Sequence, residues 1–171
     1  VVVTPAPTAP ADEAPTTDAA AASAVVHGVL EDVAAGLDAR ASTASAHARP
    51  ILEAGAMMAR DPGLAMGIDN QLKAGKGPTN AVTAAVEEIC VMFESLGGYM
   101  AERVTDLRDV RDRAVARLLG VPEPGVPTLT VPSILAAHDL APAETATLTT
   151  DTCLGIVTQA GGPTSHTAIL A

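Results

Sequence analysis

The last eleven residues of the chain, from Gly161 to Ala171, carry the pattern with the clearest chemistry: Gly-Gly-Pro-Thr-Ser-His-Thr-Ala-Ile-Leu-Ala. Two glycines and small hydroxyl residues precede His166, and an apolar helical turn follows it. This order predicts an imidazole at the start of a helix, where unpaired backbone N–H groups and the helix dipole favour an anion. A neutral imidazole nitrogen is a good nucleophile near pH 7, so His166 is the candidate acceptor of a phosphoryl group.

The residues before His166 suit a bound phosphate. Gly161 and Gly162 let the backbone approach the phosphate oxygens without Cβ atoms in the way. The hydroxyls of Thr164 and Ser165 can cap the helix, hydrogen-bond the phosphate or fix the tautomer of the ring. Taken alone, the pattern leaves a second interpretation open, in which His166 only caps a helix or packs in a core.

Composition narrows the classes of partner. The chain has 171 residues, a formal net charge of −10 and 48% apolar residues. This acidic balance argues against nucleic acid as a partner, because nucleic-acid binders use basic surfaces. No apolar run is long enough to predict a membrane span and no signal-peptide pattern is visible, so we expect a cytoplasmic protein. Cys90 and Cys153 lack the spacing of metal ligands, and no metal site is predicted.

Hydrophobic spacing divides the chain into three parts. Residues 1–17 hold a short valine strand and a proline-rich linker, and residues 18–120 have apolar residues at helical spacing. The expected helices lie near 18–45, 51–59, 62–73, 78–96 and 99–119. Residues 121–171 contain short apolar runs bounded by turn signals, as in a partial α/β domain. If residues 1–3 join the same sheet, the helical part is an insertion into that domain.

The run from Gly161 to Ala171 resembles the phosphohistidine signature of enzyme I of the bacterial sugar phosphotransferase system. Variants of this signature mark the swivelling domains of pyruvate phosphate dikinase and phosphoenolpyruvate synthase. The segment 139–146 resembles an enzyme I segment with a threonine 21 residues before the active histidine, and Thr145 and His166 have this spacing. Segments 57–64 and 107–120 resemble the helical subdomain of enzyme I, which the dikinases lack.

The resemblance implies an α+β fold, in which a helical bundle of two helical hairpins is inserted into a swivelling α/β phosphohistidine domain that is truncated here. It implies phosphoryl transfer from phosphoenolpyruvate to His166, as a tele-phosphohistidine, and then to the phosphocarrier protein HPr. Thr145 would orient the imidazole. HPr would dock on the helical subdomain, at the positions that match the family: Met57, Met58, Leu64 and Arg103.

The same resemblance implies that phosphoenolpyruvate, Mg²⁺ and the second subunit of a homodimer bind a C-terminal domain outside this chain, which itself needs no cofactor. Two alternatives stay open. One is a swivelling phosphohistidine domain of the dikinase or phosphoenolpyruvate synthase type. The other is a non-catalytic helical module that docks a partner while His166 caps a helix.

The chain departs from the family pattern in its charges. All ten lysines and arginines lie between Arg40 and Arg117, so residues 121–171 contain none. Pro163 stands where many family members carry arginine, which removes both a cation and an N–H group beside the phosphate. A phosphate at His166 would therefore depend on backbone N–H groups and hydroxyls. In the docking segment, Arg60 and Gly63 replace acidic residues.

Overall fold

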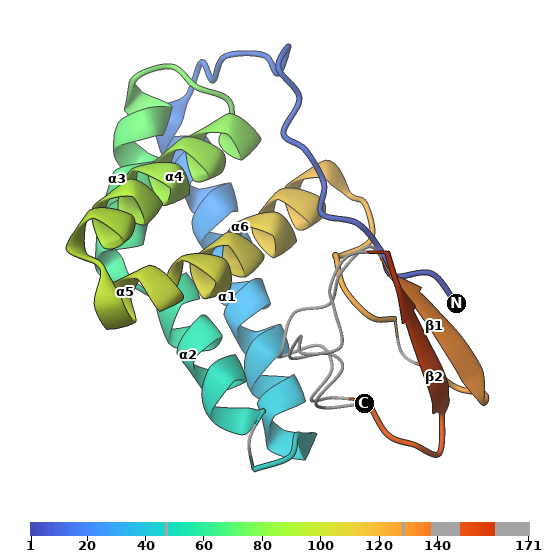
Figure 1. The fold of residues 1–171 in the computed structure, drawn as a ribbon. Helices are drawn as coiled ribbons and strands as arrows, with labels where there is room; N and C mark the ends of the chain where they lie inside the picture. Colours follow the sequence, from blue (N-terminus) through green and yellow to red (C-terminus); the bar gives the residue numbers. More distant parts are fainter. Residues whose placement is uncertain (47, 128, 138–147, 160–171) are drawn as a thin grey trace.

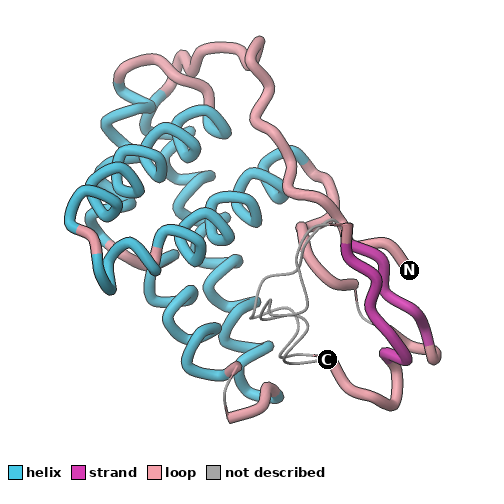
Figure 2. The backbone as a smooth tube through the Cα atoms, viewed as in Figure 1, coloured by secondary structure: helices cyan, strands magenta, loops and turns pink. Residues whose placement is uncertain are grey.

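The computed structural model describes residues 1–46, 48–127, 129–137 and 148–159. A helical part and a pair of strands lie side by side within these ranges (Figure 1), and Figure 2 shows loops connecting them. The elements in chain order are α1 (Ala19–Thr43), α2 (Arg49–Ala59), α3 (Pro62–Lys73), α4 (Pro78–Leu96), α5 (Gly98–Glu102), α6 (Val104–Leu119), β1 (Ser133–Ala137) and β2 (Cys153–Thr158).

Most helix bounds follow local signals in the sequence. Asp18 and Asp61 each accept hydrogen bonds from two backbone N–H groups in the first turn of α1 and α3. Gly120 ends α6 in the left-handed region, with φ of 66°, where glycine has no Cβ to clash. The predicted helices 62–73 and 78–96 are confirmed residue for residue.

The predicted helix 99–119 is wrong in one respect, because the structure divides it at Arg103 into α5 and α6. The backbone N–H of Arg103 donates to the carbonyl of Met100 at 3.0 Å, three residues earlier, whereas an α-helix bonds four residues earlier. This tighter turn changes the direction of the chain. As a result, Arg103 lies at a joint rather than within the last helix.

The core of the helical part lies between α1, α3, α4 and α6, with α2 packed on α1 and α6. Each of these five helices contributes buried residues on one face, as the helical period requires, whereas α5 contributes none. The fully buried side chains include Val26 and Val33 of α1, Ile68 and Leu72 of α3, Val82 and Val86 of α4, and Val110 and Val115 of α6. Val25 of α1 lies off the buried face of its helix and is 57% exposed.

Helix α1 is long and apolar enough to cross a membrane when only length and composition are considered. In the structure, apolar residues of α1 pack in the core of the helical part. Six of its residues, among them Leu30 and Leu37, are buried in the core of the helical part. A core helix of a globular domain passes the same test of length and composition, and α1 is such a helix.

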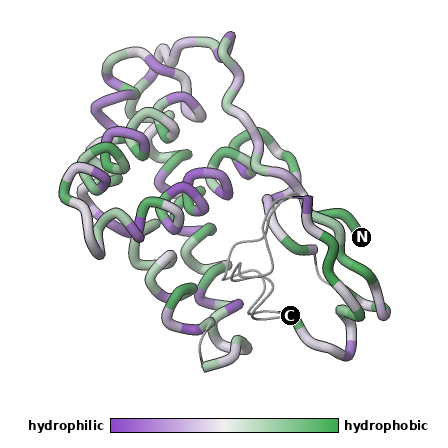
Figure 3. Tube along the Cα trace, in the orientation of Figure 1, coloured by the Kyte–Doolittle hydropathy of each residue, from purple (hydrophilic) through white to green (hydrophobic). Residues whose placement is uncertain are grey.

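The strands form a parallel pair, in which Leu135 of β1 lies opposite Ile156 of β2. The first residues of the chain join this pair, because Val2 bridges Ala136 in parallel and Val3 N–H donates to the Ala136 carbonyl at 3.0 Å. Figure 3 shows hydrophobic residues along both strands. The helices therefore enter between two segments that pair with each other, and the predicted insertion is confirmed.

Candidate functional site

The residues predicted to handle the phosphoryl group lie outside the described residues. They are His166, Thr145, Gly161, Gly162, Thr164 and Ser165. The structure describes the strands that lead to them. β1 ends at Ala137 and β2 ends at Thr158, and each of the two strands is followed eight residues later by one of the candidates, Thr145 or His166.

The register of the strand pair relates these two segments. Ala136 pairs with Val157 and Ala137 with Thr158, so each pair is offset by 21 residues. Beyond the last pair, the N–H of Gln159 still donates to the carbonyl of Ala137 at 3.0 Å. Because the strands are parallel, β1 and β2 both end at the carboxyl edge of the sheet, where α/β proteins place ligand-binding loops.

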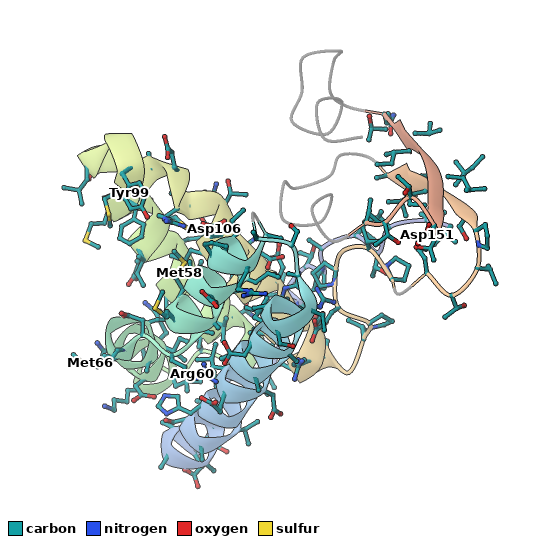
Figure 4. The ribbon with its side chains drawn as sticks, turned by 90° about the horizontal axis from the view of Figure 1, so that it is seen from below. Met58, Arg60, Met66, Tyr99, Asp106 and Asp151 are labelled. Atoms are coloured by element: carbon teal, nitrogen blue, oxygen red, sulfur yellow. The ribbon has the colours of Figure 1, made fainter. Side chains whose placement is uncertain are left out.

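The predicted docking residues Met57, Met58, Leu64 and Arg103 all belong to the helical part, but they differ in exposure. Met57 is 67% exposed, and Met58 is partly buried against the core. Figure 4 shows Met58 and Tyr99 on the side of the helical part that faces away from the strands. Two of the four predicted residues, Met57 and Met58, thus have side-chain atoms that a partner can reach.

The prediction that Leu64 is a docking residue is wrong, because Leu64 is only 1% exposed. It belongs to the buried stripe of α3 with Ile68 and Leu72, which follow at intervals of four residues. A side chain in this stripe packs against the neighbouring helices and cannot reach a partner. The role of Leu64 is therefore to hold α3 in place.

Arg103 is engaged within the helical part. Its guanidinium carbon lies 4.5 Å from the centre of the Tyr99 ring, and one N–H hydrogen-bonds the Tyr99 hydroxyl. Another nitrogen forms an ion pair with Asp106 at 3.1 Å. Arg103 stacks on the ring and so orients Tyr99, whose side chain stays 63% exposed.

The charge of Arg60 is neutralised by α1. Its guanidinium forms ion pairs with Glu31 and Asp38, both at 2.7 Å. Hydrogen bonds from Arg60 hold the pKa of Glu31 below its ordinary value, and the hydrogen bond to Glu31 raises the pKa of Arg60. The basic residue that replaces an acid in the predicted docking segment therefore adds little free positive charge to this surface.

Three further exposed apolar residues of the helical part escaped prediction. Met66 of α3 is 66% exposed, Leu96 at the end of α4 is 65% exposed, and Tyr99 lies in α5. The signal for Met66 was present in the sequence, because it falls between the buried positions 64 and 68 and off their stripe. We group Met57, Met58, Met66, Leu96 and Tyr99 under the name methionine surface for the proposal below, and Figure 4 labels three of them, Met58, Met66 and Tyr99.

A metal site is not formed by the part of the chain that the structure describes. No group of three or more histidine, cysteine, aspartate or glutamate side chains lies close enough there to hold an ion. The acidic side chains that do approach one another are held by arginines, as at Glu87, which contacts Arg108 and Arg111. Carboxylates that are paired with arginines in this way do not fit Mg²⁺.

Comparison with known families identifies the class. Residues 1–103 match the family "PEP-utilising enzyme, N-terminal", and residues 129–171 match "PEP-utilising enzyme, mobile domain". The chain therefore belongs to the PEP-utilising enzymes, where PEP stands for phosphoenolpyruvate.

Relatives are similar over most of this chain. A phosphoenolpyruvate-protein phosphotransferase of Streptomyces coelicolor is 47% identical over 95% of this chain, which spans 29% of that protein. The protein of the same name from Listeria monocytogenes is 40% identical over 71% of this chain, which spans 22% of it. The chain thus spans less than a third of these relatives.

Solved structures show the same fold. The solution structure of Enzyme I (nEIt) matches with a TM-score of 0.74 and 35% identity, over 88% of this chain and 62% of the other. The N-terminal domain of Enzyme 1 - Nitrogen matches with a TM-score of 0.69 over 99% of this chain and 72% of the other. At 24% identity, the second likeness concerns the fold alone.

Proposed function

We propose that this chain is the phosphohistidine and carrier-binding part of a phosphoenolpyruvate–protein phosphotransferase. The observation that carries the proposal is the pairing of Val1–Val3 with β1, which makes the helical part an insertion into the unit that leads to the His166 motif. The family matches to both units and the printed names of the relatives support the same function.

The reaction transfers the phosphoryl group in two steps. The neutral Nε2 of His166 attacks phosphorus, the bond from phosphorus to the enol oxygen breaks, and the enolate takes a proton on carbon to become pyruvate. The phosphohistidine then passes the group to a histidine of HPr. Thr145 orients the ring, while Gly161, Gly162 and the hydroxyls of Thr164 and Ser165 hold the phosphate oxygens.

HPr docks on the methionine surface in this proposal. Methionine is flexible and polarisable, which suits an adaptable contact, and exposed apolar side chains that gather on one face are typical of interfaces. The chain carries a formal net charge of −10 and Arg60 is paired, so a carrier with a basic rim around an apolar centre is complementary. Met57 and Met58 keep their predicted role, and Arg103 acts through Tyr99.

The remaining parts of the proposal concern the full-length protein. Phosphoenolpyruvate, Mg²⁺ and the second subunit of a homodimer bind outside this chain, and the reaction takes place in the cytoplasm. This chain then supplies the carrier site and the phosphohistidine, as expected for a chain that spans 29% of its relative from Streptomyces coelicolor.

One labelling experiment tests the function. The full-length protein that carries this chain is incubated with ³²P-labelled phosphoenolpyruvate and Mg²⁺, with and without HPr, and acid-labile phosphate is mapped. Label on His166 that moves to HPr, and that is absent from His166→Ala but present in His27→Ala, supports the proposal. Labelling that requires ATP supports a dikinase-type domain. No label on His166 leaves only the non-catalytic helical module.

A further inference from the structure

Helix α4 begins without a capping side chain of its own. Its N-cap is Gly77, and Pro78 follows as the first helical residue. The next two residues, Thr79 and Asn80, have backbone N–H groups that no residue within the helix can satisfy. In an ordinary helix a serine, threonine, aspartate or asparagine at the N-cap would accept these hydrogen bonds.

Glu13 supplies the missing cap from the segment that connects the first strand residues to α1. Its two carboxylate oxygens accept hydrogen bonds from the N–H groups of Thr79 and Asn80 at 3.0 and 2.9 Å. Gly77 makes room for it, because a Cβ at that position would lie 2.5 Å from the carboxyl carbon of Glu13. The glycine N-cap and the distant glutamate therefore form one arrangement.

The Asn80 side chain fixes the same segment a second time. Its amide nitrogen donates to Glu13 at 3.0 Å and to the carbonyl of Pro10 at 2.8 Å. Pro10 also accepts from the backbone N–H of Glu13 at 3.2 Å, which closes a turn. The turn at residues 10–13 is thus fastened to the start of α4.

The segment that leaves the helical part is held in the same way. Both carboxylate oxygens of Glu123 are occupied, one by Arg113 at 3.0 Å and the other by Arg117 at 2.6 Å. Arg113 is only 4% exposed and also pairs with Asp109. Burial raises the pKa of Glu123, but the hydrogen bonds and charges of the two arginines outweigh it and hold that pKa below its ordinary value.

The two connecting segments also pair with each other close to the strands. The backbone groups of Thr4 and Gly125 exchange two hydrogen bonds, at 3.1 and 3.0 Å. Each segment is therefore fixed at two points: its glutamate binds the helical part, and its backbone pairs with the other segment beside the strands. Figure 1 shows the two segments close together where they reach the strands.

We propose that Glu13 and Glu123 are positioning residues, which clamp the two connecting segments and so fix the helical part relative to the strands. The proposal rests on the proposed function in one respect, since it makes the clamps set where a docked carrier stands relative to His166. In this proposal neither glutamate has a chemical role in the transfer. Both act by holding the geometry in which transfer occurs.

The variants release the first clamp in two independent ways. Glu13→Gln removes the charge and turns one acceptor into a donor, while Gly77→Ala leaves Glu13 intact and displaces it by a methyl group. Asp12→Asn is the matched control, because it removes the same charge from the exposed neighbouring residue. Glu123→Gln tests the second clamp separately. Far-UV circular dichroism should give the same spectrum for each variant as for the parent, which checks that the helices are retained.

Distance measurement tests the clamp without reference to catalysis. Spin labels are placed at Val25 of α1 and Val157 of β2, which are 57% and 61% exposed, in a background with Cys153→Ser. Double electron–electron resonance on the full-length protein should give one narrow distance distribution for the parent and Asp12→Asn. Glu13→Gln and Gly77→Ala should broaden it. Distributions as narrow as that of the control would overturn the proposal.

Kinetics test the consequence for transfer. The release of the clamp should slow transfer from phosphorylated His166 to HPr by about tenfold, which corresponds to an increase of about 1.4 kcal/mol in the activation free energy. The KM for HPr and labelling by phosphoenolpyruvate should match those of Asp12→Asn. A broadened distribution with an unchanged transfer rate refutes the positioning role. No transfer even in the parent and the control bears on the proposed function, and the distance distributions then decide the clamp alone.

Discussion

Leu64→Ala and Met57→Ala should separate a core residue from a docking residue among the positions that the family resemblance groups together. Leu64 is 1% exposed and Met57 is 67% exposed. Truncation of a buried leucine removes apolar contacts and leaves a cavity in the core. Truncation of an exposed methionine removes few contacts and leaves no cavity. We therefore expect Leu64→Ala to lose stability and keep carrier binding, and Met57→Ala to keep stability and lose carrier binding.

The close approach of α3 and α4 sets the size of the effect at Leu64. A Cβ on Gly67 of α3 would lie 3.4 Å from the Cβ of Ala85 in α4, an ordinary contact distance, so the two helices are already close and have little room to move together. Leucine-to-alanine changes in cores cost about 2–5 kcal/mol, and little relaxation favours the upper half of that range. Leu64→Ala should lower the free energy of unfolding by about 3–5 kcal/mol, and Met57→Ala by less than about 0.5 kcal/mol.

Urea unfolding followed by far-UV circular dichroism measures the stability of each variant, and isothermal titration with HPr measures binding below the urea transition. Met57→Ala should weaken HPr binding by at least fivefold, since residues that matter at an interface cost about 1 kcal/mol or more when truncated. Leu64→Ala should bind within about twofold of the parent while it is folded. If Leu64→Ala keeps its stability and loses HPr binding, the assignment of Leu64 to the core is refuted.

Three further predictions concern single residues. Asp61→Ala should lower the free energy of unfolding by about 1 kcal/mol, because α3 loses the acceptor for two N–H groups, and urea unfolding checks this against Asp12→Asn. Glu123 has a lowered pKa, so its stabilising effect is present above its ordinary pKa of 4.5 and is lost as the pH falls through its pKa in the folded state. Glu123→Gln should therefore be less stable than the parent at pH 7, with the difference closing below about pH 4.5 in a pH series of thermal unfolding. Burial raises the pKa of the Cys90 thiol, so a thiol reagent should modify the partly exposed Cys153 in the folded protein and reach Cys90 only after denaturation.

The helices could be predicted because their signals are local. Asp61 followed by proline marks the start of α3 within two residues, and Gly120 marks the end of α6. Leu64 could have been assigned correctly from the same sequence, since it shares a four-residue spacing with Ile68 and Leu72. Its resemblance to a docking position favoured the surface, and its own helical stripe decides for the core.

The clamp at Glu13 could not be predicted in this way. Its hydrogen bonds to Thr79 and Asn80 join residues 66 and 67 positions apart, and no local pattern encodes such a contact. The sequence shows only that a capping side chain is missing, because the residue before Pro78 is a glycine. An uncapped helix start in a predicted bundle indicates that an acceptor comes from elsewhere, but it does not say from where.

The spacing between Thr145 and His166 has a physical basis in the described strands. Every regular pair between β1 and β2, from Ile134 with Gly155 to Ala137 with Thr158, joins residues 21 positions apart. Thr145 and His166 continue that same offset. Thr145 and His166 each follow the last residue of their strand by eight residues, so the spacing of the motif equals the register offset of the parallel pair. A one-residue insertion between Ala137 and Thr145 that kept the same strand residues paired would increase the strand offset by one. Thr145 and His166 would still be 21 residues apart, so the two spacings would no longer be equal. The 21-residue spacing therefore depends on equal lengths of chain after the two strands, and it supports the proposed pairing of Thr145 with His166 more strongly than either residue alone.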